Sequence, residues 1–327
     1  MNLLITGGAG FMGSHFVKYL LTHYPTYRVV VFDKLTYAGN LENLKEIEDN
    51  EFYTFIPGDI GDASALAAAI EEHRIEAIVN YAAETHVDRS IISPKDFLLT
   101  DIIGTDTLLA AVRRHGLKRM VQISTDEVYG DIQGEAVNES APFRPSSPYA
   151  AAKAGGDHLC HAHYRTYQTP VIVTHSCNFY GPNQYPEKLI PLFITNLLED
   201  KPVPVYGDGG QVREWIFVAD HCRAIDLILH HGQVGESYNI GTGQEIKNID
   251  TARELLQLLG KDESYIEHVT DRPGHDRRYA INCAKLKKEL GWEPKVSFAD
   301  GLKKTVEWYR ENERWWRKMI GNEEIMK

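Results

Sequence analysis

The sequence contains no long hydrophobic run and no recognisable leader. No apolar stretch approaches the ~18 residues that a membrane-spanning helix requires. The first residues, MNLLITGGAGF, lack the charged segment and the cleavage site of a signal peptide. We therefore expect a soluble, cytoplasmic protein.

Cysteine is also scarce, with 4 among 327 residues and no C-x-x-C pair, so we expect reduced thiols. One cluster, DHLCHAH, places His158 and His161 three residues apart on a predicted helix, a spacing compatible with metal binding. No second pair of ligands stands at a motif spacing. We expect no metal and interpret this helix face as a packing or subunit contact.

Basic residues are fewer than acidic ones. The chain has 35 Lys and Arg and 46 Asp and Glu, which gives a net charge of −11. That balance disfavours a broad nucleic-acid or anionic-membrane surface, although a local basic cluster could still hold a small anion. The hydrophobic share of 43% and charged share of 25% are typical of a globular protein.

The first half of the chain alternates between strand and helix patterns. Strands are expected at 2–7, 27–33, 77–83, 119–124 and 171–176, and helices at 13–24, 63–73, 104–116 and 147–168. This alternation predicts the α/β class, with a Rossmann-type doubly wound parallel sheet covered by helices on both faces.

After residue 178 the alternation weakens and Pro, Gly and Tyr become frequent, so we expect a smaller C-terminal substrate-binding domain. Its helices are predicted at 253–260 and 299–316, and the aromatic residues near the end should pack as core. The expected domains are therefore 1–177 and 178–327, with segments around 214–243 packing back on the first. No linker separates them, so a cleft should lie between them.

A glycine-rich turn follows the first predicted strand and opens the first helix. Gly7, Gly10 and Gly13 are spaced G-x-x-G-x-x-G, which lets a pyrophosphate sit on the helix N-terminus. The next strand ends at Asp33, whose carboxylate would bind a ribose 2′-hydroxyl and repel a 2′-phosphate. NAD is therefore favoured over NADP, although Lys34 weakens the preference. Asp59, after a third strand, is placed either to reach the adenine or simply to form a turn.

Further along, YAAAK places Tyr149 and Lys153 one helical turn apart on one face. A phenol is a weak base at neutral pH, since its ordinary pKa is about 10. A nearby ammonium and a positively charged nicotinamide would favour the phenolate. This pair suits the removal of a hydroxyl proton while hydride leaves the same carbon.

Between these motifs, RMVQISTDEVYG carries two adjacent carboxylates at the end of a buried strand. On a continuing strand Asp126 and Glu127 would face opposite sides. We expect the strand to stop at Ser124 and the loop that follows to aim both inward, because ligands bind beyond the carboxyl ends of parallel strands.

The chain resembles the extended short-chain dehydrogenases/reductases, and within them the nucleoside-diphosphate-hexose 4,6-dehydratases. The resemblance runs nearly end to end and is carried by TGGAGFMGS, DKLTYAGNLENL, AAETHVDRSI, STDEVYG, SPYAAAKA, GPNQYPEKLIPLFI, YNIG and DRPGHDRRYAI. It implies an NAD-dependent lyase of deoxysugar biosynthesis, acting on a nucleoside-diphosphate-hexose such as dTDP-glucose and assembled as a homodimer.

The resemblance also implies a role for each reacting residue. Tyr149 would deprotonate the C4 hydroxyl, Thr125 would hydrogen-bond the C4 oxygen, and Lys153 would hold the ribose and tune Tyr149. Glu127 would remove the C5 proton and Asp126 would protonate the departing C6 hydroxyl. Two carboxylates can divide base and acid work if their surroundings differ, so Asp126 should have a raised pKa.

The remaining expected contacts form two sets. Those to NAD are Gly7, Gly10, Phe11, Met12, Gly13, Asp33, Lys34, Leu35, Thr36, Asp59, Ile60, Tyr81, Ala82, Ala83, Thr85, Thr100, Tyr149, Lys153 and Asn178. Those to the nucleotide-sugar are Thr85, Thr125, Asn178, Lys188, Leu189, Pro204, Tyr206, Arg213, Asn248, Arg272 and His275. Candidates for a diphosphate clamp are Lys188, Arg213, Arg272, His275 and Arg278.

The chain departs from the usual family pattern at Met12, Thr85, Asp101 and NFYGPNQ (178–184). A UDP-linked hexose or N-acetylhexosamine would use the same machinery, as would an enzyme that oxidises C4 and epimerises C5. A 4-epimerase would share Tyr149 and Lys153 but would not need both Asp126 and Glu127. A non-catalytic dinucleotide-binding module would need none of these four side chains.

Overall fold

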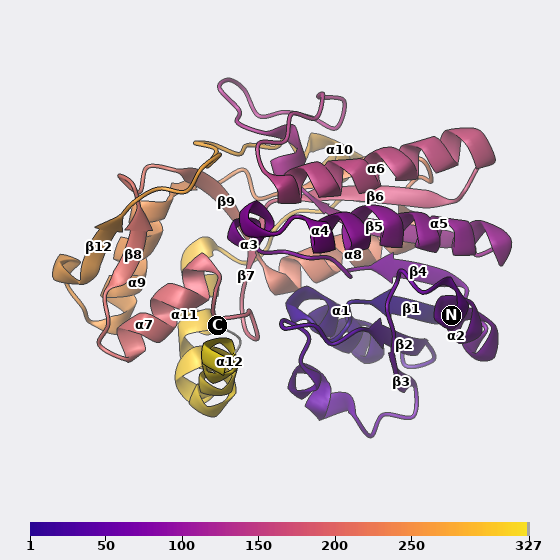
Figure 1. Cartoon of the computed structure of the whole chain (residues 1–327), viewed down its shortest axis with the longest axis horizontal. Helices are drawn as coiled ribbons and strands as arrows, with labels where there is room; N and C mark the ends of the chain where they lie inside the picture. The colour runs from indigo at the N-terminus through magenta and orange to yellow at the C-terminus, as the bar shows by residue number, and fades with distance from the viewer. Residues whose placement is uncertain (326–327) are drawn as a thin grey trace.

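A computed structural model of the chain describes residues 1–325, with side chains described as far as residue 321. Its largest sheet has seven strands in the order β10-β6-β5-β4-β1-β2-β3, and every pairing is parallel. The strands are β1 (Asn2–Thr6), β2 (Arg28–Asp33), β3 (Tyr53–Pro57), β4 (Ala77–Asn80), β5 (Arg119–Thr125), β6 (Val171–Ser176) and β10 (Ser237–Ile240). The predicted Rossmann-type sheet is therefore confirmed (Figure 1).

Helices cover both faces of this sheet. One face carries α1 (Phe11–His23) and α8 (Val218–His231); the other carries α2 (Ala63–His73), α5 (Thr105–Arg114) and α6 (Pro148–Tyr167). Along β1 the side chains alternate between the two cores, since Leu3 and Ile5 join the α1 side and Leu4 joins the α2 side. Burial on both faces explains why these strands are nearly continuous apolar runs.

The second half of the chain builds a smaller unit beside the carboxyl ends of the large sheet (Figure 1). A three-stranded sheet joins β7 (Asn178–Tyr180), β9 (Val212–Phe217) and β11 (Glu245–Lys247), and a two-stranded sheet joins β8 (Val203–Tyr206) and β12 (Ile266–Val269). The helices of this unit are α7 (Leu189–Leu198), α9 (Asn248–Leu259), α11 (Phe298–Glu311) and α12 (Glu313–Ile325). Helix α10 (Ala284–Leu290) packs instead against β10 and α8 of the large sheet.

Short helical segments complete the chain. They are η1 (Leu41–Ile47), α3 (Val87–Ile92), α4 (Lys95–Phe97), η2 (Leu98–Gly104), η3 (Asp126–Tyr129) and η4 (Glu263–Tyr265). Among them η2 has the wider hydrogen-bonding pattern of a π-helix. A single-turn π segment inside a longer helical run is frequent at functional sites.

Several boundaries differ from the sequence prediction by a few residues, and two of the differences change what an element does. Strand β5 extends to Thr125, which still pairs with Ser176 of β6, so Thr125 is not in a loop. The single helix expected over 299–316 is two helices, because α11 ends at Glu311 and α12 begins at Glu313. The bend lets Trp315 and Trp316 turn into the core, where they are 9% and 1% exposed, which confirms the predicted packing of the terminal aromatics.

The segment 214–243 returns from the smaller unit to the large sheet. It supplies α8 and then β10, which pairs with β6 at the sheet edge. Within residues 1–325 no helix is both long and apolar enough to cross a membrane.

Candidate active site

A cavity of about 450 Å³ lies between the carboxyl ends of the large sheet and the smaller unit. Strands β1, β2, β4, β5 and β6 all point their ends toward it, as expected for a ligand site in a parallel sheet. The predicted residues that line it are Gly7, Gly10, Phe11, Met12, Gly13, Asp33, Lys34, Thr36, Asp59, Ile60, Tyr81, Ala82, Ala83, Thr85, Thr100, Thr125, Glu127, Tyr149, Lys153, Asn178, Lys188, Leu189, Pro204, Tyr206, Arg213, Asn248, Arg272 and His275.

Three residues singled out from the sequence do not line this cavity. Leu35 has a left-handed backbone (φ 54°) and an exposed side chain, and its amide donates to Asp33. Asp126 lies behind the lining residues, 2% exposed. Arg278 pairs with Glu245 and donates to two carbonyls of the 132–134 loop, so its expected part in a diphosphate clamp is wrong.

The glycine turn is shaped for close approach by a ligand. A Cβ on Gly13 would lie 2.3 Å from the Gly7 carbonyl oxygen, and a Cβ on Gly7 would lie 2.5 Å from the Ala82 nitrogen. Helix α1 has Gly10 as its N-cap and no side chain caps its first amides. Unsatisfied amides at a helix N-terminus, with no side chain in front of them, fit the pyrophosphate of a dinucleotide.

The end of β2 fits the ribose of the same ligand. One carboxylate oxygen of Asp33 accepts from the Ala9 amide (2.9 Å) and the other from the Leu35 amide (2.8 Å). Each oxygen keeps a lone pair that can accept from a ribose hydroxyl. Lys34 is turned to Asp59, with 2.7 Å between Nζ and Oδ2, so its charge is already matched by a carboxylate.

The carboxylate pair is set by a change of backbone at the end of β5. Thr125 is the last paired residue of the strand and also the N-cap of η3, its hydroxyl oxygen accepting from the Glu127 amide at 3.3 Å. Asp126 and Glu127 are the first two residues of η3. In a tight helical turn, neighbouring side chains are no longer on opposite faces, and both carboxylates are buried near Thr125.

Burial raises the pKa of the Asp126 carboxyl well above its ordinary value, and the negative charges of Glu127 and Glu214 raise it further. Arg213 opposes this effect. Only one hydrogen bond reaches the group from the described residues: Oδ1 accepts from the Thr125 hydroxyl at 3.3 Å, and Oδ2 has no partner among them. The raised pKa predicted for Asp126 is confirmed, and the neutral acid is favoured.

Glu127 has more positive surroundings. Burial raises the pKa of its carboxyl, but Arg213, Arg272 and Lys188 lower it, and Oε2 accepts from the Tyr279 hydroxyl at 3.3 Å. The Arg213 guanidinium lies 4.1 Å above the centre of the Tyr279 ring. Two adjacent carboxyls therefore differ in environment, which allows one to act as a base and the other as an acid.

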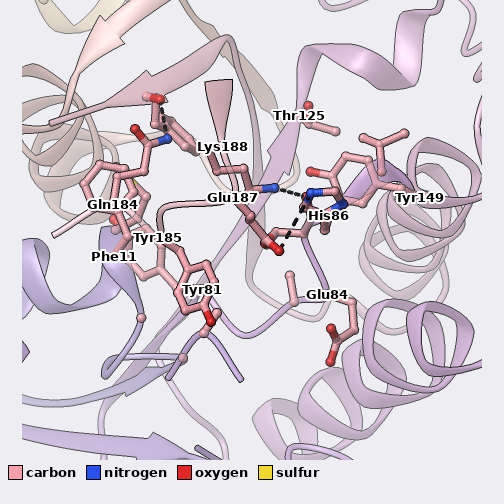
Figure 2. Close-up of a pocket in the computed structure, with 18 of the residues that line it drawn as sticks. Phe11, Tyr81, Glu84, His86, Thr125, Tyr149, Gln184, Tyr185, Glu187 and Lys188 are labelled. Atoms are coloured by element: carbon pink, nitrogen blue, oxygen red, sulfur yellow. Dashed lines mark hydrogen bonds and ion pairs between the residues drawn. The ribbon is translucent and has the colours of Figure 1, made fainter. Parts of the chain in front are cut away.

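Helix α6 positions the tyrosine and the lysine. The Ser147 hydroxyl oxygen caps the helix by accepting from the Ala150 amide (3.1 Å), and Pro148 begins it, which puts Tyr149 in the first turn. The Tyr149 amide donates to the Ser90 hydroxyl at 3.1 Å. Tyr149 and Thr125 lie near each other on one side of the pocket (Figure 2).

The main contacts of the lysine are with a backbone carbonyl and a carboxylate. Lys153 Nζ donates to the Ile123 carbonyl of β5 (2.8 Å) and lies 3.5 Å from Asp101 Oδ1. Burial raises the pKa of Tyr149 well above its ordinary value, and the carboxylates of Glu127 and Asp101 add to the increase. The Thr125 hydroxyl opposes this increase, but the neutral phenol is favoured by the chain's own groups.

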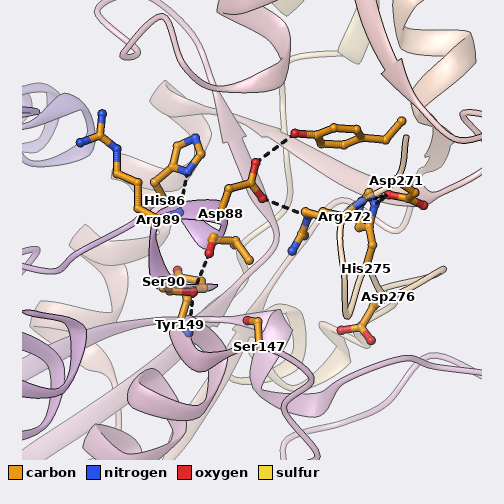
Figure 3. A network of polar contacts seen from close by, with 12 residues as sticks. His86, Asp88, Arg89, Ser90, Ser147, Tyr149, Asp271, Arg272, His275 and Asp276 are labelled. Atoms are coloured by element: carbon orange, nitrogen blue, oxygen red, sulfur yellow. Dashed lines mark hydrogen bonds and ion pairs between the residues drawn. The ribbon is translucent and has the colours of Figure 1, made fainter. Parts of the chain in front are cut away.

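Two basic side chains of the smaller unit, Arg272 and His275, contact carboxylates. Arg272 Nε lies 3.5 Å from Asp88 Oδ1, while the Tyr206 hydroxyl donates to Asp88 Oδ2 at 3.0 Å (Figure 3). His275 Nδ1 is 2.6 Å from Asp271 Oδ1. Asp88 belongs to α3 beside the large sheet, so its contacts with Arg272 and Tyr206 bridge the two units.

A second bridge was not anticipated from the sequence. Glu187 lies 3.2 Å from Arg89 and 3.7 Å from His86, and it accepts from the Tyr37 hydroxyl at 2.8 Å. Beside it, Lys188 Nζ donates to the Thr85 carbonyl at 2.5 Å. His86, Glu187 and Lys188 are close together in Figure 2. No local spacing signals such a cluster, because its members come from three distant loops.

Other residues missed from the sequence are Tyr279, which donates to Glu127, and Glu84, which lines the cavity. Both lie within stretches that carried the family resemblance, so a rule that examined every polar residue of those stretches could have found them. Among residues 1–325 no group of three or more His, Cys, Asp or Glu is placed to hold a metal.

Comparison with known proteins gives a consistent result. The sequence model of the GDP-mannose 4,6-dehydratase family matches residues 4–305. A dTDP-glucose 4,6-dehydratase of Streptomyces niveus is 50% identical over 99% of this chain and 97% of that protein. The structure of the dTDP-glucose 4,6-dehydratase of Streptomyces venezuelae, solved with NAD bound, has a TM-score of 0.95 and 51% identity, covering 98% of this chain and 100% of that one.

The fold extends to enzymes of related activity. A UDP-glucose 4-epimerase of Thermotoga maritima, solved with UDP-glucose, has a TM-score of 0.89 and 33% identity over 95% of this chain and 99% of that one. Epimerases and dehydratases therefore share this scaffold, and the groups in the cavity must distinguish them.

We predict that Gly13→Ala weakens NAD binding by about tenfold or more, corresponding to about 1.4 kcal/mol. The added Cβ would lie 2.3 Å from the Gly7 carbonyl oxygen and 2.7 Å from the Gly8 Cα, so the turn must move. The measurement is the NAD retained after gel filtration, quantified after denaturation. Gly134→Ala is the control, since its Cβ would meet nothing within 4 Å. Equal retention in both variants would contradict the prediction.

Proposed function

The chain belongs to the GDP-mannose 4,6-dehydratase family of short-chain dehydrogenases/reductases, and we propose that it catalyses the NAD-dependent 4,6-dehydration of dTDP-glucose. The product is the 4-keto-6-deoxy sugar nucleotide. One observation carries the proposal beyond the family: a buried Asp126-Glu127 pair with unlike surroundings lies at the end of β5, near Tyr149 and Lys153.

NAD is held by the chain's own groups at the carboxyl ends of β1 and β2. The amides at the start of α1 would bind its pyrophosphate and Asp33 would bind a ribose hydroxyl. When bound, NAD supplies the redox chemistry by taking a hydride from C4 and returning it to C6. Lys153 would hold the nicotinamide ribose, and the hydrogen bond from Nζ to Ile123 would keep the lysine in place.

Tyr149 removes the proton of the C4 hydroxyl in this proposal, and the Thr125 hydroxyl hydrogen-bonds the same oxygen. The contact of Thr125 with the phenol lowers the pKa of Tyr149, opposing the effect of the carboxylates. A charged nicotinamide beside the ring would act in the same direction as Thr125. The phenol is therefore expected to become a base only when the cofactor is bound.

Glu127 removes the C5 proton, which the C4 ketone has made acidic, and Asp126 protonates the C6 hydroxyl so that it leaves as water. The positive surroundings of Glu127 favour its carboxylate, while the burial and like charges around Asp126 favour its neutral acid. Because Asp126 lies behind the lining residues, its side chain must turn toward the cavity when the sugar is bound.

The protons must balance over each turnover. Glu127 returns its proton to C5 when hydride is returned to C6, so its charge is restored. Tyr149 ends with one proton more and Asp126 with one fewer. Tyr149 must therefore lose a proton and Asp126 must gain one before the next substrate reacts. These protons are exchanged with solvent or with groups in contact with the two residues.

The smaller unit, residues 178–327 apart from the returning segment around 214–243, is proposed to bind the nucleotide. Lys188, Arg213 and Arg272 surround the cavity and would hold the diphosphate. Arg272 already contacts the Asp88 carboxylate, so the diphosphate would share or replace that contact. We propose Asn178, Leu189, Pro204, Tyr206, Asn248 and His275 as further substrate contacts.

We propose that the chain forms a homodimer through the face formed by η2 and α6, which pack against each other. Large apolar side chains are exposed on and near it: Ile92 is 85% exposed, Leu99 50% and Ile103 54%. A second copy would bury these residues against the same face. His158 of α6 is also exposed, and we propose that DHLCHAH contributes to the contact.

We predict that incubation with dTDP-glucose yields a product lighter by one water, and that deuterium placed at C4 appears at C6. Mass spectrometry and NMR of the product check both. UDP-glucose and UDP-N-acetylglucosamine, assayed in parallel, report the preferred nucleotide and sugar. If the label stays at C4, or if the sugar is epimerised with no loss of water, the dehydratase proposal is wrong.

A second prediction separates the two carboxylates. Glu127→Gln should abolish exchange of the C5 proton with solvent and lower turnover by about 10²- to 10⁴-fold. Asp126→Asn should keep the C5 exchange but slow the release of water, because only the acid has been lost. Exchange is followed by deuterium incorporation from D₂O. Equal behaviour of the two variants in both measurements would exclude separate roles.

A third prediction concerns assembly. Ile103→Asp should shift a dimer toward monomer in light scattering after gel filtration, because it places a charge on an exposed apolar face. Leu41→Asp, at a side chain 43% exposed on η1 away from this face, is the matched control and should leave the mass unchanged. A monomeric wild-type chain at micromolar concentration would contradict the proposed dimer.

A further inference from the structure

Asp101 is a buried carboxylate next to Lys153, behind the residues that line the cavity, and the mechanism above has no use for it. It lies in the π-helical segment η2 and is 2% exposed. Oδ2 has no hydrogen-bond partner among the described residues. A carboxylate so deeply buried is costly unless a cation compensates it.

The compensating cation is the lysine of the active site. Asp101 Oδ1 lies 3.5 Å from Lys153 Nζ, and the two side chains are 1% and 4% exposed. The other contact of the ammonium is the Ile123 carbonyl, at 2.8 Å. Lys153 is therefore held between the backbone of β5 and the carboxylate of η2.

The backbone around this pair leaves little room for it to move. A Cβ on Gly156 would lie 2.5 Å from the Asp101 carbonyl oxygen, so α6 and η2 touch at the backbone. A Cβ on Gly155 would lie 2.8 Å from the side chain of Ile102. The wider π turn directs Asp101 toward the helix that carries Lys153 and Tyr149.

We propose that Asp101 is the counter-ion of Lys153, a positioning residue that fixes the ammonium and limits how strongly it favours the phenolate of Tyr149. Asp101 acts through Lys153 and is not required to touch substrate. The inference rests on the proposed use of Tyr149 as a base.

The charges around the phenol support this role. Carboxylates face Tyr149 from two elements: Glu127 and Asp126 from η3, and Asp101 from η2. Each negative charge disfavours the phenolate. Lys153 is the cation on the same helix face, so any group that neutralises it also opposes ionisation of Tyr149.

The surroundings of Asp101 also raise its own pKa. Burial raises the pKa of Asp101 to about 6, and Lys153 lowers it from a still higher value. Asp157 of α6 raises the pKa of Asp101, and the Glu84 amide lowers it. Glu84, which lines the cavity, is a further carboxyl in this region, and burial and the charge of Asp101 raise its pKa to about 7.

Asp101→Asn tests the proposal, because it keeps the shape and removes the charge. The acid limb of the pH profile of kcat/KM on dTDP-glucose should move to lower pH by about half a unit or more, because one charge opposing the phenolate is gone. If the rate falls but the acid limb stays at the same pH, Asp101 has only a structural role, and the proposal is overturned.

The matched control is Asp106→Asn in α5, which removes the same charge from a side chain 53% exposed. Its acid limb should stay where the wild type has it, since solvent screens the charge. A shift as large as that of Asp101→Asn would also overturn the proposal.

A measurement without substrate keeps this inference separable from the proposed function. Carbon-13 NMR of labelled aspartate carboxyls, with Asp101 assigned from Asp101→Asn, should show a midpoint near the pKa of about 6. Lys153→Met should raise that midpoint, because the cation that lowers it is lost. An unmoved midpoint means that the two groups do not interact, whether or not the chain dehydrates dTDP-glucose.

Discussion

Thr125 is both the last paired residue of β5 and the cap of the short helix that follows, and the site depends on this change of backbone. Pairing with β6 holds the residue at the carboxyl edge of the sheet. The cap then starts a tight turn in which Asp126 and Glu127 come together. Were the strand to continue, strand alternation would place one carboxylate in each core of the sheet.

Burial at that edge makes charge the second constraint. Asp126, Glu127 and Glu214 are all largely buried, and each has a raised pKa. Glu214 is stabilised by three backbone amides, whereas Glu127 lies near arginines and a lysine. Arg213 also lowers the pKa of Asp126, but burial and the charges of Glu127 and Glu214 outweigh it, so the proton is best kept there. The difference between the adjacent carboxyls arises from their neighbours and not from their own chemistry.

The sequence predicted the sheet, its covering helices and most of the cavity lining, because these depend on local patterns. Apolar runs identified the strands, and glycine spacing identified the dinucleotide turn. It could not predict that the Leu35 side chain would lie outside the cavity lining, or that Arg278 would form an ion pair with Glu245. It also could not predict that Glu187 would contact side chains from two distant segments of the chain. Such contacts join residues that are distant in the chain and have no periodicity.

What the sequence by itself determined is therefore the kind of chemistry: a dinucleotide turn, a tyrosine and lysine one helical turn apart, and two carboxylates after a strand. Only the tertiary structure decided the electrostatic state of each group. Asp101 and Lys153 are 52 residues apart, yet their buried contact sets the charge near Tyr149. A pKa depends on burial and on neighbouring charges, and both are created when distant segments are packed together.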